Sequence, residues 1–368
     1  MSPSSNPTLR HLLSPCTLGS LELANRMMMA PMTRSRAGAA RMPGDMHTRY
    51  YLQRRTAGLI VSEALQISQQ AIGYIGTPGI HTDEQERAWR RVVSAVHEGG
   101  GTIFAQLWHA GRVSARAFQP AGAAPVAPSA IAAPGETYTD TGPVPFDMPR
   151  ALETSEIPAI VQQFADAARR ARAAGFDGVE IHGGSGYLID QFLRDSANVR
   201  TDSYGGSAEN RVRILLEVIS AVRKECPIDR IGVRISPTVP FIGVSDSNPE
   251  RTFRVVAEAL SDFDLGYLHV IEPIADSALV SKADVPRVTP IIREHFRGRL
   301  VLNGGYDAAS AEGALARGEG DLVSFGALFV SNPDLPARFA SGAPLSPPDR
   351  ATFYGGGEQG YTDYPALA

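Results

Sequence analysis

The stretch Gly178-Val-Glu-Ile-His-Gly-Gly-Ser-Gly-Tyr-Leu-Ile-Asp-Gln-Phe-Leu193 joins a short apolar run to a histidine, closely spaced glycines and a tyrosine. A short apolar run of this kind is typical of a buried strand. The glycines that follow it allow the backbone to turn sharply and to approach a bound molecule. We therefore expect a strand that opens into an active-site loop, with His182 and Tyr187 as the polar side chains of that loop.

The same plan recurs along the chain, where short apolar runs alternate with longer amphipathic segments. The predicted strands cover residues 26–32, 59–64, 102–107, 178–182, 231–235, 267–271, 300–303 and 322–325. Helical spacing of apolar residues predicts helices at 83–98, 156–174, 207–225, 250–262 and 307–317. The strands are too continuously apolar for burial on one face only, and helices follow them. This pattern indicates an α/β fold in which a parallel sheet closes into a (β/α)8 barrel, the TIM barrel.

A doubly wound open sheet is the alternative fold. Such a sheet usually carries Gly-x-Gly-x-x-Gly after its first strand, whereas here residues 26–32 continue into Thr33-Arg-Ser-Arg36. No linker divides the chain, so we expect one barrel domain over residues 1–368. Residues 9–24 are predicted to form an N-terminal β-hairpin. Residues 108–153, rich in Ala, Pro and Gly, are predicted to form a long insertion after the third strand.

Composition narrows the functional classes. The net charge of -4 gives no electrostatic footprint for nucleic acid or an anionic membrane, so we expect a small-molecule substrate. Cys16 and Cys226 are too few for a disulfide framework or a cysteine-rich metal site. The N-terminus lacks a signal-peptide pattern, and no apolar run reaches the roughly 18 residues of a membrane helix. A cytoplasmic protein is therefore expected, with monomer and homodimer both open.

In a barrel of this type the active site forms where the strands end, so the residues just after each apolar run are the candidates. They are Pro31, Met32, Thr33, Glu63, Ala64, Gln106, Trp108, His109, His182, Ser185, Tyr187, Arg234, Asn303, Gly304, Gly305, Gly326 and Ala327. Among them there is no pair of carboxylates and no His/Asp/Glu set with metal spacing. This argues against a hydrolase or a metalloenzyme, and no metal is predicted.

Motifs over nearly the whole chain resemble those of the Old Yellow Enzyme family and occur in the family's order. Three of them are Gln106-Leu-Trp-His-Ala-Gly-Arg112, Arg200-Thr-Asp-Ser-Tyr-Gly-Gly-Ser207 and Gly232-Val-Arg-Ile-Ser-Pro237. Further matches lie at 25–37, 58–64, 77–80, 186–193, 209–211, 331–335 and 353–357. A chance resemblance on this scale is very improbable.

The resemblance implies a flavoprotein, an ene-reductase that uses FMN to carry hydride from NAD(P)H to the β-carbon of an activated alkene such as an α,β-unsaturated carbonyl. It implies that Thr33 bonds the flavin C4 carbonyl and that Gln106 pairs with the pyrimidine edge. Arg234 would place positive charge beside N1 and the C2 carbonyl, where the reduced flavin is negative. Pro31 and Ala64 would approach the ring through backbone atoms.

For the substrate, the resemblance implies that His182 holds the carbonyl oxygen and that Tyr187 protonates the α-carbon as general acid. Trp108 and Tyr354 would shape the substrate pocket. Each of these side chains also has a structural interpretation, since a histidine, tyrosine or tryptophan can serve packing and internal hydrogen bonds alone. Gly304 and Gly305 gain weight as a phosphate cradle from their position, because barrel phosphate sites commonly follow strands seven and eight.

The chain departs from the family's pattern at two ligand-gripping positions. Ser185 stands where the family has a second imidazole or an amide, and its shorter side chain would miss the substrate oxygen or reach it through water. Such a lost contact costs about 1 to 3 kcal/mol. Ala327 stands where the family uses an arginine on the FMN phosphate, so backbone amides near Gly304, Gly305, Gly326 and Ala327 would have to bind it, with lower affinity.

These departures leave two other functions open. Ser185 suggests a flavin-dependent isomerase or desaturase of a biosynthetic intermediate, because a poor grip on simple enones would then be expected. Ala327 suggests a barrel that binds a ligand without redox chemistry. The flavin-ring contacts Thr33, Gln106 and Arg234 are all present, which favours a specialised enzyme over a decayed one. The ene-reductase remains the leading hypothesis.

Overall fold

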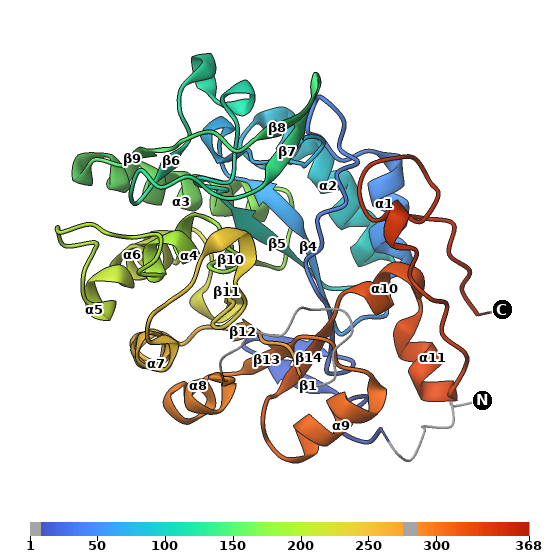
Figure 1. Ribbon diagram of the computed structural model, residues 1–368. Helices are drawn as coiled ribbons and strands as arrows, with labels where there is room; N and C mark the ends of the chain where they lie inside the picture. The colour runs from blue at the N-terminus through green and yellow to red at the C-terminus, as the bar shows by residue number, and fades with distance from the viewer. Residues whose placement is uncertain (1–8, 275–285, 368) are drawn as a thin grey trace.

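Eight parallel strands close into a barrel in the computed structural model, which describes residues 9–274 and 286–367 (Figure 1). The strands are β3 (Met27–Met29), β4 (Leu59–Gln66), β5 (Ile103–Trp108), β10 (Gly178–His182), β11 (Ile231–Ile235), β12 (Tyr267–Ile271), β13 (Leu300–Asn303) and β14 (Leu322–Phe325). Pairing of β14 with β3 completes the ring. The predicted (β/α)8 barrel is confirmed, and the doubly wound alternative is wrong. The strands from β10 to β14 begin and end at the predicted residues.

The helices lie around the outside of the strands (Figure 1). They are α1 (Asp45–Gln53), α2 (Asp83–Glu98), α3 (Ile157–Ala173), α4 (Leu188–Leu193), α5 (Ala208–Arg211), α6 (Arg213–Val222), α7 (Pro249–Leu260), α8 (Thr289–His295), α9 (Ala308–Ala316), α10 (Ala327–Ser331) and α11 (Leu335–Ser341). The helix predicted at 207–225 forms two helices, α5 and α6, which meet at Val212. The sequence pattern does not predict α1, α4, α8, α10 or α11. None of the helices in the two described ranges is long and apolar enough to cross a membrane.

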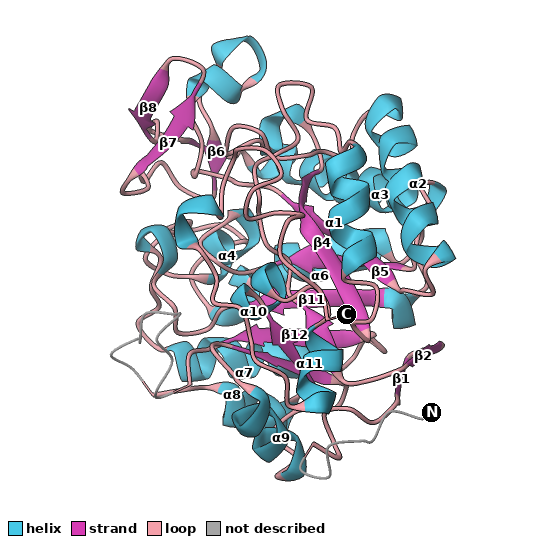
Figure 2. Cartoon of the chain, turned by 90° about the vertical axis from the view of Figure 1, so that its right-hand side faces the viewer, coloured by secondary structure: helices cyan, strands magenta, loops and turns pink. Residues whose placement is uncertain are grey.

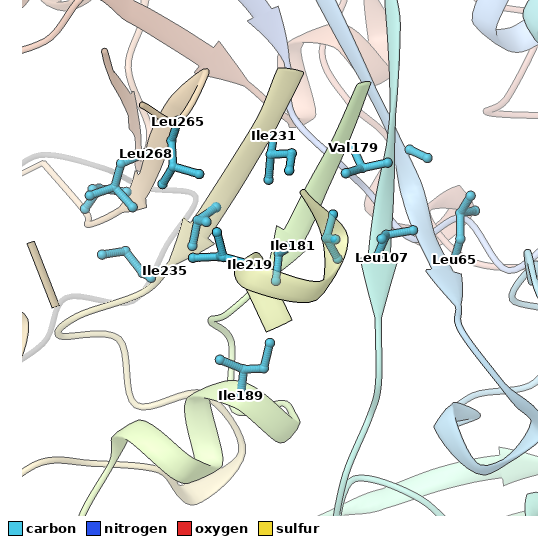
Figure 3. Packing of buried hydrophobic residues seen from close by; sticks show 14 of the residues in the cluster. Leu65, Leu107, Val179, Ile181, Ile189, Ile219, Ile231, Ile235, Leu265 and Leu268 are labelled. Atoms are coloured by element: carbon cyan, nitrogen blue, oxygen red, sulfur yellow. The ribbon is translucent and has the colours of Figure 1, made fainter. Parts of the chain in front are cut away.

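Side chains along each strand alternate between the barrel interior and the surrounding helices, because successive strand residues point to opposite faces. On β10, Val179 and Ile181 belong to the outer core, and Figure 3 shows them with Ile219 of α6. Glu180 and His182 alternate with these two residues along the strand and therefore point inward. The alternation explains how an apolar strand can deliver two polar side chains to the interior.

The amino end of the barrel interior is apolar and closed. The predicted N-terminal hairpin is present as β1 (Cys16–Leu18) and β2 (Leu21–Leu23), which pair antiparallel. Hairpin and strands share an inner cluster that consists of Cys16, Leu18, Leu23, Met28, Leu59, Val61, Phe104, Tyr267, Val301 and Leu322. Because most of these strand residues lie at or near the starts of their strands, the hairpin plugs the amino end and leaves the carboxyl ends for a ligand.

The segment after β5 forms the short strands β6 (Val126–Ala127), β7 (Glu136–Thr139), β8 (Gly142–Pro145) and β9 (Arg150–Ala151). β7 and β8 make an antiparallel hairpin, and β6 pairs parallel with β9. Figure 2 shows the β7–β8 hairpin and the β1–β2 hairpin on opposite sides of the barrel strands. Ala133 and Phe146 of this segment pack with Ala64 and Trp108 at the strand ends. The segment therefore covers part of the carboxyl mouth.

Candidate active site

Polar side chains from distant parts of the chain meet at the carboxyl ends of the strands. Arg234, on β11, donates from Nη1 to the carbonyl oxygen of Pro31 (3.3 Å) and from Nη2 to Oδ1 of Asn303 (3.4 Å). Asn303 in turn donates from Nδ2 to the carbonyl oxygen of Ser324 (3.0 Å). The structure thus brings together predicted site residues that lie at or just after the carboxyl ends of β3, β11 and β13.

Arg234 is a buried cation with spare hydrogen-bonding capacity. It is 7% exposed, and its Nε finds no partner among the described residues. Burial lowers the pKa of Arg234 below its ordinary value, yet a guanidinium stays protonated in proteins. Its two acceptors are neutral oxygens, so both the charge and the unused N–H fit an electron-rich ligand edge.

Gln106 lies on β5 beside Ala64 of β4. Its Nε2 donates to Oε1 of Glu180 at 2.8 Å. Because this hydrogen bond commits the amide nitrogen to the barrel interior, the carbonyl oxygen of Gln106 is the atom that remains to accept a hydrogen bond from a ligand. Glu180 is a functional candidate that the residue-by-residue sequence pattern does not single out, since it lies inside an apolar run.

The loop that carries Thr33 is fixed to the C-terminal segment. Arg34, the next residue, donates from Nε to the carbonyl oxygen of Phe353 (2.9 Å) and from Nη2 to that of Gly360 (2.8 Å). Half-buried Thr33 and exposed Tyr354 flank these anchors. The two predicted residues are therefore held on the same side of the mouth.

His182 is a buried, neutral imidazole. The backbone N–H of Gly184 donates to its Nδ1 at 3.3 Å, so the single ring proton is assigned to Nε2. Burial, aided by the charge of Arg234, lowers the pKa of His182 to about 3. At ordinary pH the ring therefore stays neutral and can offer Nε2–H to a ligand oxygen.

Tyr187 lies in an aromatic cluster beside His182. Its ring centroid is 5.1 Å from that of His182 and 5.1 Å from that of Trp108, and both contacts are edge-on. Its hydroxyl donates to the hydroxyl of Tyr74 at 3.3 Å. Burial raises the pKa of Tyr187 well above its ordinary value and raises that of Tyr74 to about 12. Both hydroxyls therefore keep their protons at ordinary pH.

Tyr74 is a site residue that sequence reasoning missed. It stacks on Trp108 with ring centroids 5.9 Å apart and planes 12° apart. It lies in an irregular segment between the motifs at 58–64 and 77–80, where neither periodicity nor motif points to it. An ionised Tyr354 would raise the pKa of both Tyr74 and Tyr187 further, so Tyr354 lies within electrostatic range of their hydroxyls. Trp108 is buried, and its Nε1 has no partner among the described residues.

The β13–β14 end of the mouth is built from backbone. Gly304 has a φ of +140°, and a Cβ on it would stand 1.9 Å from the carbonyl oxygen of Glu272. Gly305 follows with a φ of +96°, a value that also favours glycine. Gly326 precedes α10, whose first residue is the half-buried Ala327, and a Cβ on Gly326 would stand 3.5 Å from Sδ of Met32. An anion at this end could be bound by the main-chain N–H groups of Gly304, Gly305, Gly326 and Ala327.

Ser185 occupies a strained backbone position. Its φ is +58°, in the left-handed region that few non-glycine residues adopt. Its backbone N–H donates to Oγ of Ser236 at 2.6 Å, which anchors the loop between Gly184 and Gly186. The structure thus fixes the main chain at Ser185 two residues before Tyr187.

Comparisons with known proteins identify the family of the chain. A family model described as the NADH:flavin oxidoreductase / NADH oxidase family matches residues 11–346. The solved structure of the Old Yellow Enzyme homologue from Zymomonas mobilis has a TM-score of 0.94 and 46% identity, over 97% of this chain and 99% of that chain. The chain belongs to the Old Yellow Enzyme family.

Other Old Yellow Enzyme relatives match over similar lengths. 12-oxophytodienoate reductase 1 of Oryza sativa subsp. japonica is 45% identical over 359 residues, which are 97% of this chain and 93% of that protein. 12-oxophytodienoate reductase 2 of Arabidopsis thaliana is 43% identical over 363 residues, 97% and 96% of the two chains. Morphinone reductase, solved in complex with tetrahydroNAD, has a TM-score of 0.92 and 47% identity, over 97% and 98%.

This Old Yellow Enzyme family member is an FMN-dependent oxidoreductase that takes hydride from NAD(P)H and reduces activated alkenes. The chain is thus an enzyme, and the barrel without redox chemistry is not supported. The buried Arg234 with its unused Nε–H, together with the backbone cradle at Gly304, fits the ring and the phosphate of such a cofactor.

Proposed function

We propose that this chain reduces α,β-unsaturated carbonyl compounds by a division of labour between His182 and Tyr187. The arrangement of these two side chains carries the proposal: a neutral imidazole that presents Nε2–H lies 5.1 Å, ring to ring, from a protonated tyrosine. His182 would hold the carbonyl oxygen of the substrate and withdraw electron density from the alkene. Tyr187 would donate its hydroxyl proton to the α-carbon.

Arg234, Gln106 and Thr33 would hold the flavin ring, with Pro31, Met32 and Ala64 against it. Bound FMN supplies the hydride that it has taken from NAD(P)H. Arg234 would face the N1 and C2 carbonyl edge, and Gln106 would accept from the pyrimidine edge through its carbonyl oxygen. The unused Nε–H of Arg234 and the committed amide nitrogen of Gln106 support these two contacts.

The phosphate would bind at the β13–β14 end, to the main-chain N–H groups of Gly304, Gly305, Gly326 and Ala327. The positive φ angles of Gly304 and Gly305 support this phosphate site, because such a backbone aligns N–H groups and glycine has no side chain to block them. Asn303 would hold this end to Arg234 through its side chain. The absence of an arginine at Ala327 predicts weaker binding of FMN than a charged clamp would give.

Tyr74 would assist Tyr187. The Tyr74 hydroxyl accepts a hydrogen bond from the hydroxyl of Tyr187. After Tyr187 has given that proton to the substrate, the Tyr74 hydroxyl can turn and donate to the remaining phenolate oxygen. Trp108, which packs on both tyrosines, and Tyr354 at the rim would shape the substrate pocket around them.

Ser185 favours a second candidate function, the isomerisation or desaturation of a biosynthetic intermediate. Its side chain gives His182 no imidazole or amide partner for the substrate oxygen, so simple enones would be held by one strong donor. A substrate with further contacts elsewhere would be less affected. Assay of a panel of enones separates the two functions: fast reduction of the flavin with negligible turnover of every enone would favour isomerisation.

The direct test follows the visible spectrum of the purified protein. We expect a yellow protein that bleaches anaerobically with NADPH and regains its colour when a cyclic enone is added. NADH is run in parallel to determine which nicotinamide cofactor reduces the flavin faster. A yellow protein that bleaches but does not recover with any enone would contradict alkene reduction as the second half-reaction.

We also propose that the enzyme works on small molecules in the cytoplasm as one (β/α)8 barrel domain, without nucleic-acid or membrane partners. The net charge of -4 and the two cysteines support this. Monomer and homodimer are both compatible with the chain. Sedimentation of the purified protein decides between them.

A further inference from the structure

A continuous chain of buried hydrogen bonds lies below the mouth of the barrel. Ser324 Oγ is 2.7 Å from Nε2 of His269, and His269 Nδ1 is 2.9 Å from Oε2 of Glu180. The other carboxylate oxygen, Oε1, accepts from Nε2 of Gln106. None of these four side chains is more than 2% exposed. The chain therefore links β14, β12 and β10 to Gln106 on β5.

The surroundings of Glu180 and His269 determine their protonation states. Burial by itself raises the pKa of Glu180, but the neighbouring His269 and Arg234 outweigh burial, so the pKa lies below its ordinary value and Glu180 is ionised. Burial lowers the pKa of His269, which is therefore neutral. A neutral ring beside a carboxylate carries its proton on Nδ1 and donates it to Glu180. Its Nε2 then accepts from Ser324.

Ser324, His269 and Glu180 are the residue types of a Ser-His-Glu hydrolase triad. They do not lie where such a triad could act. A nucleophilic serine must face a bound substrate, with donors for the oxyanion nearby. Ser324 is 2% exposed and points into the packed barrel interior, where its second contact is the carbonyl oxygen of Leu302 at 3.5 Å. This series of hydrogen bonds is thus an internal support. The residue that it holds in place, Gln106, lies at its other end.

The other end of this hydrogen-bond series lies beside Gln106 and Arg234, the two residues proposed to contact the flavin ring. Gln106 has its amide nitrogen tied to Glu180, which fixes its amide orientation. His182 pairs with Arg234 across β10 and β11, and Glu180 lies two residues before His182 on the same inward face. Arg234 has neutral hydrogen-bond acceptors, and the negative charge of Glu180 stabilises its protonated form.

We propose that Glu180, held by His269 and Ser324, is a positioning residue that orients Gln106, offsets the charge of Arg234 and thereby sets the reduction potential of bound FMN. The inference rests on the proposed contacts of Gln106 and Arg234 with the flavin ring. Reduction adds negative charge at the edge that Arg234 would face, so a negative Glu180 behind Arg234 makes reduction harder. The carboxylate would tune the cofactor without touching it.

The experiment compares the midpoint potential of FMN in the holoenzyme with that in two variants, each of which removes one charge. Glu180→Gln keeps the size and the hydrogen bond to Gln106 but removes the negative charge, so the potential is expected to shift to a more positive value. Arg234→Gln removes the positive charge, so the potential is expected to shift to a more negative value or FMN binding is expected to be lost. Opposite shifts support the inference.

Glu272→Gln is the matched control. Glu272 is equally buried, but it bonds Thr238, Thr289 and the backbone N–H of Val288, away from Gln106. Its replacement should leave the potential at the wild-type value. An equal shift in Glu272→Gln would mean that any buried charge has this effect, and it would overturn the inference.

The remaining outcomes separate the inference from the proposed function. If Arg234→Gln shifts the potential or loses FMN while Glu180→Gln matches the wild type, the tuning role is overturned and the cofactor placement stands. If neither variant differs from the wild type, the placement itself is overturned. If Glu180→Gln does not fold, nitrogen NMR of histidine-labelled wild-type holoenzyme decides: protonated Nδ1 in His269 supports the inference, and protonated Nε2 overturns it.

Discussion

The two ends of the barrel mouth are built in different ways. At the β5–β10–β11 end, Gln106, His182 and Arg234 are side chains whose orientation other groups fix by hydrogen bonds. At the β13–β14 end, Gly304 and Gly305 shape the site through main-chain conformation alone. Side chains can be exchanged one at a time, whereas a backbone cradle survives the exchange of its neighbours. This difference explains how a departure such as Ala327 can be compatible with an intact anion site.

Tyr187→Phe is the strongest test of the side-chain end. It removes only the hydroxyl, so the ring contacts with His182 and Trp108 remain. We expect alkene reduction to slow about 100- to 10,000-fold, the usual contribution of a general acid. Flavin reduction by NADPH should change little, because Tyr187 acts in the second half-reaction. Stopped-flow measurement of both half-reactions checks this, and equal slowing of the two would show that the role is wrong.

Gly304→Ala tests the backbone end. The new Cβ would stand 1.9 Å from the carbonyl oxygen of Glu272 at a φ of +140°. We expect the free energy of unfolding to fall by about 3 kcal/mol, the upper end for a strained backbone position, and FMN to bind more weakly. Denaturant unfolding and FMN titration measure the two effects.

Gly318→Ala is the control for this prediction. Gly318 also has a positive φ, +73°, but no atom lies within 4 Å of an added Cβ. The expected loss is therefore about 1 kcal/mol, the conformational term alone, with unchanged FMN affinity. If the two alanine variants unfold alike, close packing at Gly304 does not shape this end of the mouth.

The sequence predicts the fold better than it predicts the site. The strands from β10 to β14 have the predicted bounds because runs buried on both faces stand out from their surroundings. The first strand is shorter than the predicted 26–32: β3 ends at Met29, and Pro31, two residues on, has no N–H to continue a ladder. The helix predicted at 207–225 is divided at Val212, and nothing in the local sequence marks that division.

The unpredicted parts of the site depend on contacts between distant residues. Tyr74 acquires its place from Tyr187, which lies 113 residues away in the sequence. Glu180 appears as one polar residue in an apolar strand until the barrel brings Gln106 and His269 to its two oxygens. Inward and outward faces of a strand can be read from alternation, but the partners across a closed barrel depend on the register of all eight strands.

Ala327→Arg would give the backbone end a side-chain clamp like those of the other end. A charge-assisted hydrogen bond is worth about 1.5 to 3 kcal/mol, so FMN should bind roughly 10- to 150-fold more tightly. Titration of apoprotein with FMN measures the change. Ala327→Met adds comparable length without charge and should leave the affinity near that of the wild type. Equal affinities in the two variants would place the phosphate elsewhere.

Ser185→Asn would add a second donor beside His182, and its expected effect is the smallest. Asparagine adopts left-handed backbone more readily than serine, so the φ of +58° should accept it. One further hydrogen bond to the substrate oxygen is worth about 1 kcal/mol, or roughly fivefold in kcat/KM for a simple cyclic enone. Flavin reduction by NADPH should not improve, since that step does not involve the substrate oxygen.

Ser185→Ala separates this gain from an effect of the loop. It keeps the main chain and removes the hydroxyl, so a fall in kcat/KM would mean that Ser185 already contributes a hydrogen bond, directly or through water. If alanine and asparagine both behave like the wild type, the grip on the oxygen does not limit enone turnover. His182 alone would then suffice to hold the substrate oxygen, and Ser185 would serve to make room for a larger substrate.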